Sequence, residues 1–219
     1  MEAREFVAGL VAEMEALFAR LGERQTLEAE SGGRLEVATL LRLALQSEIE
    51  AAELAGFWMP TTPEIDAKMV FARQCGDEMK HYHLISKRLG ELGEDVSGHD
   101  PLAGGYSPLY HHAKGLKRTV ERVAAGPFAR EAIAEVRNDQ FIAFCEAAGD
   151  AETARLYREV IQPDESLHHR LGREFLERHA TTSELQAATA AATRETLAIA
   201  DELSTLVERS TGMGPLPVS

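Results

Sequence analysis

Two pairs of ionisable side chains with the same spacing constrain the fold of this chain more than any other feature. Glu78 and His81 form a Glu-x-x-His pair, and Glu165 and His168 form a second one. The two glutamates are 87 residues apart, and so are the two histidines. Because residues three positions apart share one helix face, each pair is typical of a helix that presents Glu and His together.

A single glutamate precedes each pair at a matching distance. Glu48 and Glu135 are also 87 residues apart, and each lies 30 residues before the glutamate of its pair. The midpoint of the first copy falls in the stretch 60–63, which begins and ends with a proline that disfavours helix. The midpoint of the second copy falls at Gly149-Asp150, a typical helix end followed by a typical helix start. Each copy therefore predicts two antiparallel helices joined by a turn.

The two predicted hairpins would bring six side chains to one level of a four-helix bundle. From each turn the chain runs about 15 residues out and back, roughly 22 Å at 1.5 Å per residue, so the acidic positions meet at one height. The six candidate metal ligands are Glu48, Glu78, His81, Glu135, Glu165 and His168. Four buried carboxylates would each cost on the order of several kcal/mol unless cations neutralise them. Two divalent ions supply that charge, and a set rich in oxygen, with one nitrogen per ion, suits iron or manganese better than structural zinc.

Apolar residues at spacings of three and four predict helices in most of the chain. We expect helices over residues 1–24, 35–58, 63–92, 108–124, 127–148, 151–179 and 183–209. Pro127 is expected in a first helical turn, and Pro163 is expected to kink its helix two residues before Glu165. The fold class is therefore all-α, a four-helix bundle with a long crossing connection and extra N- and C-terminal helices.

The chain of 219 residues is long enough for one domain with appended helices. We expect an N-terminal amphipathic helix within residues 1–30 and the bundle over residues 35–179. A C-terminal helix over residues 183–211 would pack on the bundle or on a partner. The apolar stripes of these terminal helices are compatible with a homodimer.

Charge and composition limit the partners and the compartment. The formal net charge of −13 repels nucleic-acid phosphates, so no polynucleotide partner is expected. The two cysteines, Cys75 and Cys145, are too few for a disulfide framework, which favours a reducing cytoplasm. The first five residues lack the basic start and apolar core of a signal peptide, and no uncharged apolar run of about 18 residues occurs. We therefore expect a cytoplasmic protein without a membrane-spanning segment.

Several acids close to the six candidates are open to two interpretations. Glu50, Glu53, Asp77 and Asp164 are expected on solvated faces. In the alternative, Asp77, Asp164 or Asp139 fixes the orientation of an imidazole, as carboxylates commonly do beside metals.

Two tyrosines and a set of cations are further candidates. Tyr82 and Tyr157 are either packing residues or radical or proton donors near the metals. Lys114, Arg118 and Arg122 are spaced by four and would form a basic stripe on one helix. That stripe is either a solvated helix face or the binding site of an anionic substrate such as a CoA thioester or a phosphate.

Over residues 35–179 this pattern resembles the ferritin-like di-iron carboxylate superfamily. It looks most like the hydroxylase branch, which includes tRNA-modifying di-iron hydroxylases and the phenylacetyl-CoA epoxidase catalytic subunit. The segments that carry this likeness are 77–81, 134–137, 156–157 and 164–168. The resemblance implies a ferritin-like bundle that binds two iron ions per chain, or manganese in their place, through the six side chains. It also implies that Glu78 and Glu165 bridge the ions and that the bound metals react with O2.

Two functions fit the resemblance. The first is a di-iron oxidoreductase that uses O2 to oxidise or hydroxylate a small organic substrate, with electrons from a separate donor. The alternative is a ferritin-like or rubrerythrin-like protein that oxidises iron, removes peroxide or stores iron. The 54-residue separation of His81 and Glu135, the extra terminal helices and the lack of a four-cysteine iron site favour the first. A metal-free interaction module is disfavoured because all six ligand positions are intact.

Overall fold

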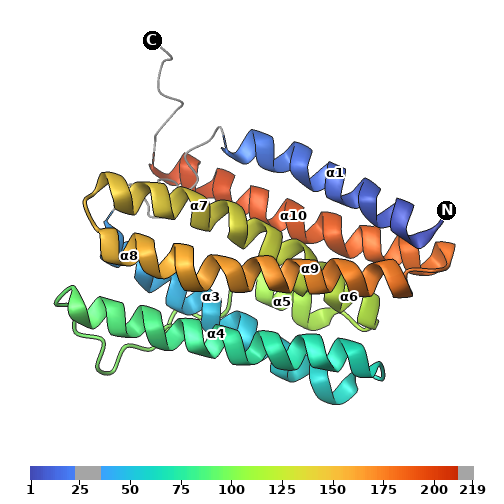
Figure 1. The fold of residues 1–219 in the computed structure, drawn as a ribbon, viewed down its shortest axis with the longest axis horizontal. Coiled ribbons are helices and arrows are strands. Elements are labelled where there is room, and N and C mark those ends of the chain that lie inside the picture. Colours follow the sequence, from blue (N-terminus) through green and yellow to red (C-terminus); the bar gives the residue numbers. More distant parts are fainter. Residues whose placement is uncertain (23–35, 212–219) are drawn as a thin grey trace, which may run out of the picture.

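The structure, a computed structural model, describes residues 1–22 and 36–211 of the chain (Figure 1). Within these ranges the regular elements are helices, and no strand occurs. The α-helices are α1 (Ala3–Gly22), α3 (Val37–Trp58), α4 (Ile65–Glu91), α5 (Pro108–Gly115), α6 (Thr119–Val123), α7 (Glu131–Ala147), α8 (Ala151–Leu156), α9 (Gln162–His179) and α10 (Ser183–Thr211). The chain also forms a 3₁₀ turn, Met59–Thr61, and two π-helical turns, Ala124–Arg130 and Tyr157–Ile161. The predicted all-α fold class is confirmed for the described residues.

The first predicted hairpin consists of α3 and α4, which pack along each other (Figure 1). After Trp58 the chain turns through Met59–Thr61 and Pro63 before α4 begins. The hydroxyl of Thr62 donates to the carbonyl oxygen of Trp58 at 2.9 Å, which closes the turn. The turn predicted at these prolines is therefore confirmed.

The second predicted hairpin consists of α7 and the continuous stretch from α8 to α9. Gly149 has a φ of 80°, a left-handed conformation that favours glycine and ends α7. Asp150 then caps α8 by accepting a hydrogen bond from the backbone N–H of Thr153 at 3.0 Å. α9 packs against both α7 and α4, so the two hairpins lie side by side (Figure 1).

Both helices of the second hairpin contain a π-helical turn near a proline. α5 stops at Gly115, whereas α6 starts at Thr119 and continues through a π-helical turn into α7. Pro127 lies inside this stretch, so the prediction that it opens a helix is wrong. Proline lacks the N–H of a regular helical hydrogen bond, and the regular helix is interrupted around it. Likewise, the irregularity that the sequence predicts at Pro163 occurs as the π-helical turn just before this proline. In that turn the N–H of Gln162 donates to the carbonyl oxygen of Tyr157, five residues earlier.

Two glycines allow side chains and helices to approach the first π-helical turn closely. A Cβ atom at Gly126 would lie 2.8 Å from the ring of Trp58. A Cβ atom at Gly172 of α9 would lie 2.8 Å from the backbone nitrogen of Phe128. Larger residues at these positions would push α3 and α9 away from the turn.

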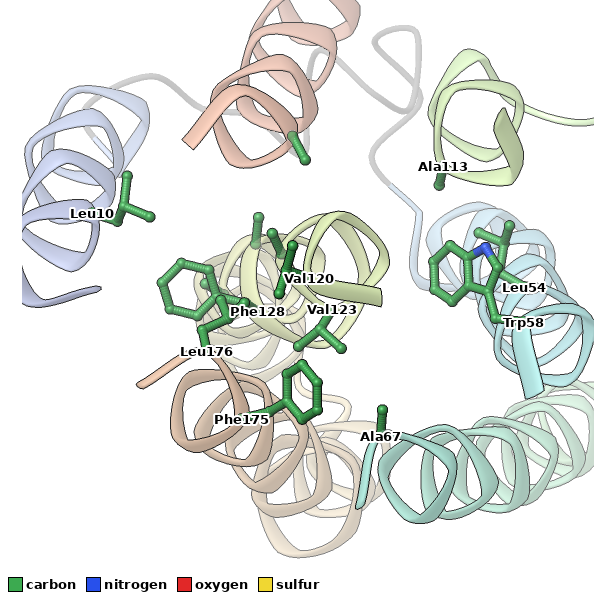
Figure 2. Close-up of a cluster of buried hydrophobic side chains, with 14 of the residues drawn as sticks. Leu10, Leu54, Trp58, Ala67, Ala113, Val120, Val123, Phe128, Phe175 and Leu176 are labelled. Atoms are coloured by element: carbon green, nitrogen blue, oxygen red, sulfur yellow. The ribbon is translucent and has the colours of Figure 1, made fainter. Parts of the chain in front are cut away.

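The apolar core forms two clusters at different heights of the bundle. The larger cluster contains Trp58 and Phe175 and extends to the terminal helices (Figure 2). The smaller cluster contains Leu45 and Ile85 near the other end. Along α3, α4 and α9, the predicted ligand positions lie between these two clusters.

The terminal helices cover the second hairpin. α1 packs on α9 and α10, and α10 packs on α5, α6 and the first π-helical turn. Arg194 of α10 pairs with Glu13 of α1, with 2.8 Å between Nη2 and Oε1. The part of the expected first helix beyond Gly22 lies outside the described residues, and the proposed division into domains stays a prediction. None of the described helices has the length and apolar content needed to span a bilayer.

Candidate metal centre

A buried layer of carboxylates and imidazoles lies between the two apolar clusters. Each of its six side chains belongs to a residue with at most 8% of its surface exposed. The members of this layer are Glu48, Glu78, His81, Glu131, Glu165 and His168. They form two overlapping groups of four, in each of which one potential ligand atom per residue lies within 4.8 Å of the others. Glu48 and His81 belong to the first group, Glu131 and His168 to the second, and Glu78 and Glu165 to both. Buried groups of this composition could hold a metal ion.

Five of the six predicted ligands lie in this layer, and a different glutamate takes the sixth place. Glu131 is buried and accepts a hydrogen bond from Nε2 of Gln74, one turn before Glu78 on α4. Glu135 lies one turn further along α7, is only half-buried and faces Ser166 and His169 of α9. The structure therefore brings Glu135 into neither group. The sequence signal for Glu131 was its spacing of four residues from Glu135, which places both on one helix face.

Both imidazoles direct Nδ1 into the layer. Nδ1 of His81 lies 3.3 Å from Oε2 of Glu78 and 3.4 Å from Oε2 of Glu48. Nδ1 of His168 lies 3.3 Å from Oε2 of Glu165 and 3.4 Å from Oε1 of Glu78. Each Nδ1 atom thus faces at least two carboxylates, and Nδ1 of His81 also lies 3.6 Å from Oε1 of Glu165.

The other nitrogen of each imidazole faces an aspartate from the opposite pair. Nε2 of His81 lies 3.2 Å from Oδ2 of Asp164, and Nε2 of His168 lies 3.2 Å from Oδ2 of Asp77. The expectation that these two aspartates are solvated is wrong, and each makes the contact with an imidazole that the alternative interpretation requires. Asp139 does not share this role, because it is exposed and accepts a hydrogen bond from Nε2 of Gln162 at 3.0 Å.

Two cations of α4 hold the aspartates from the solvent side. Arg73 donates to Asp77, and its Nη2 lies 3.6 Å from Oδ1 of Asp164. Lys80 donates to Asp164, and its Nζ lies 3.5 Å from Oδ1 of Asp77. Each aspartate therefore has an imidazole on its inner side and cations on its outer side. This arrangement compensates its charge and fixes its position.

The carboxylates of the layer compete for protons when no cation is present. Burial raises the pKa of Glu48 to about 8 and raises that of Glu165 well above its ordinary value. Burial opposes the charging of both imidazoles, but hydrogen bonds to glutamates outweigh it and raise the pKa of His81 to about 11 and that of His168 to about 9. Burial also acts against ionised Glu78, yet hydrogen bonds from both imidazoles hold the pKa of Glu78 below its ordinary value. The four carboxylates of the layer therefore hold protons when no metal ion is present, and their negative charge when ionised must be balanced by cations.

A pocket between α3 and α7 leads to the layer. The space along this pocket is about 630 Å³ when the open solvent at its mouth is included, and Glu48, Glu131 and Glu165 are among its lining residues. Tyr157, held edge-on against Phe141 with 4.7 Å between ring centroids, lines the same pocket. Its hydroxyl is buried and has no hydrogen-bond partner within the described protein. The second π-helical turn therefore places a tyrosine beside the carboxylates.

The predicted basic stripe does not form. The chain breaks between α5 and α6, which puts Lys114 on a different helix from Arg122. Arg118 precedes α6 and pairs with Glu184 at 2.7 Å. Arg122 is buried and donates to Oγ1 of Thr62 at 3.1 Å. The three cations therefore offer no common site for an anion.

The remaining candidates lie away from the layer. Glu50 is buried and accepts a hydrogen bond from the backbone N–H of Ser107 at 2.7 Å, so the expectation that it is solvated is wrong. Glu53 accepts a hydrogen bond from the hydroxyl of Tyr106 at 2.7 Å. Tyr82 packs against the smaller apolar cluster. Its role is packing, as one of the two interpretations expected.

The candidate centre thus consists of two groups that share two glutamates, with oriented imidazoles and a pocket on one side. Its donor atoms come from α3, α4, α7 and α9. In comparisons with known proteins, no family model matches the chain, and no curated protein or solved structure matches it either.

Proposed function

We propose that this chain is a ferritin-like di-iron carboxylate enzyme that uses O2 to oxidise or hydroxylate a small organic substrate. The observation that carries the proposal is the buried layer, in which two Glu-x-x-His pairs face two further glutamates. Ferritin-like di-iron sites are built from one Glu on each of two helices and a Glu-x-x-His motif on each of the other two. Here α3 and α7 supply the single glutamates, and α4 and α9 supply the pairs.

The donor set of the layer fits two such ions. Four carboxylates carry a charge of −4, which two divalent ions would balance. Each imidazole uses Nε2 on an aspartate, which leaves Nδ1 directed at the carboxylates as the natural ligand atom. A set dominated by carboxylate oxygen favours iron or manganese over structural zinc.

The side chains have distinct roles in this proposal. The first group of four would hold one ion and the second group the other, so Glu78 and Glu165 would bridge them. Two ferrous ions held in this way would supply electrons to O2. Asp77 and Asp164 would keep the proton of each imidazole on Nε2 and so keep Nδ1 available. The apolar clusters above and below the layer would exclude water from it.

The pocket favours an oxidase or oxygenase over the alternative of an iron-oxidising or iron-storing protein. A path for ferrous ions would be expected to attract cations. Apart from the four glutamates of the layer itself, the pocket is lined by apolar side chains such as Leu40, Leu43 and Phe141, by a few polar ones, and by Arg130 and Arg137. Such a lining suits an organic molecule better than a metal cation.

The proposal is tested by loading the purified protein with Fe²⁺ without air and counting the metal. We expect two irons per chain, and Glu165→Ala should lose most of them because this carboxylate would serve both ions. Glu174→Ala is the matched control, since Glu174 is an exposed glutamate of the same helix. Retention of both ions by Glu165→Ala would contradict the proposed centre.

Size-exclusion chromatography after aerobic loading with excess Fe²⁺ separates the two functions. A small oligomer that stops near two irons per chain supports the oxidoreductase. A hollow assembly of a dozen or more chains with many irons per chain would show a storage protein instead.

A further inference from the structure

The pocket beside the buried layer contains a hydroxyl group without a partner. Tyr157 is only 2% exposed and lines this pocket together with Glu48 and Glu165. Its hydroxyl makes no hydrogen bond within the described protein. A buried polar group without a partner is costly, and a ligand that supplies the partner removes this cost. A ligand with a hydrogen-bond acceptor is therefore favoured in this pocket over a ligand without one.

The protein holds this hydroxyl as a donor in a fixed position. The ring of Tyr157 packs edge-on against Phe141, and the N–H of Gln162 donates to the carbonyl oxygen of Tyr157 in the second π-helical turn. A phenol is protonated at neutral pH, and burial raises the pKa of Tyr157 further. The O–H group can therefore donate to a ligand without a change in the protonation of the tyrosine.

Much of the remaining pocket wall is apolar. Leu40 and Ala44 lie four residues apart on one face of α3, and Phe141 of α7 lines the same pocket. Leu43 is 39% exposed and therefore lies at the mouth of the pocket. A ligand that reaches from this mouth to Tyr157 must present apolar surface along most of its length.

The two arginines of the pocket are engaged with the protein itself. Nη2 of Arg130 donates to the carbonyl oxygen of Ser47 at 2.6 Å and lies 3.1 Å from Oγ of Ser47. Arg137 also has an interaction within the protein. A carboxylate or an ammonium group needs several partners to replace its water, whereas a carbonyl oxygen is satisfied by fewer. The hydroxyl of Tyr157 therefore suits an uncharged acceptor.

We infer that the substrate of this site is a slim, uncharged molecule whose carbonyl or ether oxygen accepts the hydrogen bond of Tyr157 and whose apolar body lies along Leu40 and Phe141. This inference rests on the proposed di-metal function, because bound divalent ions balance the charge of the four glutamates that also line the pocket. The acceptor end of the substrate then lies beside the layer, and the apolar end points toward the mouth at Leu43.

The test uses protein loaded with two Mn²⁺ ions per chain, whose metal content is measured first. Equilibrium dialysis compares ligands of nearly equal size and shape, which are acetophenone, isopropenylbenzene, benzoate and benzamidinium. Isopropenylbenzene has a CH₂ group in place of the carbonyl oxygen, whereas benzoate and benzamidinium carry a negative and a positive charge. We expect acetophenone to bind roughly three- to tenfold more tightly than isopropenylbenzene, because only acetophenone accepts the hydrogen bond. Both ions should bind roughly tenfold or more weakly than acetophenone, because they lose their hydration in the pocket.

Variants then test the hydroxyl and the apolar wall separately. Tyr157→Phe should abolish the preference for acetophenone over isopropenylbenzene, since the hydroxyl is lost while the ring stays. Tyr82→Phe is the matched control, because Tyr82 packs against the smaller apolar cluster and is not among the residues that line the pocket. Leu43→Ala, a change at the exposed mouth, should weaken both neutral ligands by a similar factor and keep the preference. If Tyr157→Phe does not fold, Leu43→Ala and the preference of the unchanged protein still test the inference.

Several results would overturn the inference while two Mn²⁺ ions remain bound. Acetophenone could fail to bind, or isopropenylbenzene or either ion could bind as tightly as acetophenone. Tyr157→Phe could keep the preference for acetophenone, or Leu43→Ala could leave both neutral ligands unaffected. A protein that takes up no Mn²⁺ would instead contradict the proposed function, so the two failures are distinguishable.

Discussion

Nε2 of His81 lies 3.2 Å from Oδ2 of Asp164, across the interface between α4 and α9. The reverse contact, between Nε2 of His168 and Oδ2 of Asp77, has the same length of 3.2 Å. Each aspartate directly precedes the glutamate of its own pair but supports the histidine of the other pair. The two halves of the site therefore depend on each other, and neither hairpin can orient its imidazole alone.

This reciprocal support predicts a loss of metal affinity when either aspartate is neutralised. Asp164→Asn keeps the shape of the side chain but removes the charge that holds the proton on Nε2 of His81. We expect the affinity for Mn²⁺ to fall roughly 10- to 100-fold, the usual effect of removing such a partner. Competition with a chelator measures the affinity, and Asp139→Asn, on an exposed aspartate, is the control. An unchanged affinity would mean that the imidazole is oriented without Asp164.

The choice between Glu131 and Glu135 gives a second prediction. Glu131→Gln should reduce the bound metal from two ions to about one, because the second group loses a carboxylate. Glu135→Gln should keep both ions, because Glu135 faces Ser166 and His169 outside the two groups. Metal analysis after gel filtration compares the two variants. The opposite result would restore Glu135 as the ligand that the regular spacing of the sequence indicates.

The regular spacing predicts some of the ligand positions from the sequence, whereas packing between helices decides the others. The equal offsets correctly place the two Glu-x-x-His pairs and Glu48 at one level of the bundle. They do so because the turns at the prolines and at Gly149, which set where each hairpin reverses, are local features of the sequence. Glu131 and Glu135 lie on one face of one helix, so periodicity alone cannot select between them. The selection comes from Gln74 on another helix, which holds Glu131 in the layer.

The irregular turn around Pro127 could not be predicted from the sequence for a similar reason. Pro127 is typical of a helix start, and only the packing of Trp58 and α9 around Gly126 and Gly172 keeps it inside a helix. The basic stripe failed because a break after Gly115 separates positions that a single regular helix would have aligned. Local patterns predict the helices, but contacts between distant helices decide how these helices continue.

The close approach of α9 to the first π-helical turn predicts a stability effect. A Cβ atom at Gly172 would lie 2.8 Å from the nitrogen of Phe128 and 2.9 Å from the carbonyl carbon of Pro127, and backbone atoms cannot easily move away. We expect Gly172→Ala to lower the free energy of unfolding by roughly 1–3 kcal/mol through overpacking. Gly9→Ala in α1 is the matched control, since no atom lies within 4 Å of its added Cβ. It should gain roughly 0.5–1 kcal/mol from better helix propensity. Chemical denaturation measures both values, and equal stability of the two variants would contradict the close contact.

Metal removal should make the stability of the protein depend on pH. Without metal, the pKa of Glu48 is about 8 against an ordinary 4.5, and the pKa of His168 is about 9 and that of His81 about 11 against 6.5. A raised pKa means that the folded state binds more protons than the unfolded chain between the two values, so stability falls as pH rises through this window. The lowered pKa of Glu78 acts only at acidic pH and does not change the sign above pH 6.5. We therefore expect the melting temperature of the metal-free protein to fall steadily between about pH 6.5 and pH 9. The Mn²⁺-loaded protein should change little over this range, because the ions have displaced the protons.

Adding Mn²⁺ to metal-free protein near neutral pH should accordingly release protons into a weakly buffered solution. The absence of proton release, together with equal pH profiles of the two forms, would show that the carboxylates are already paired with other cations.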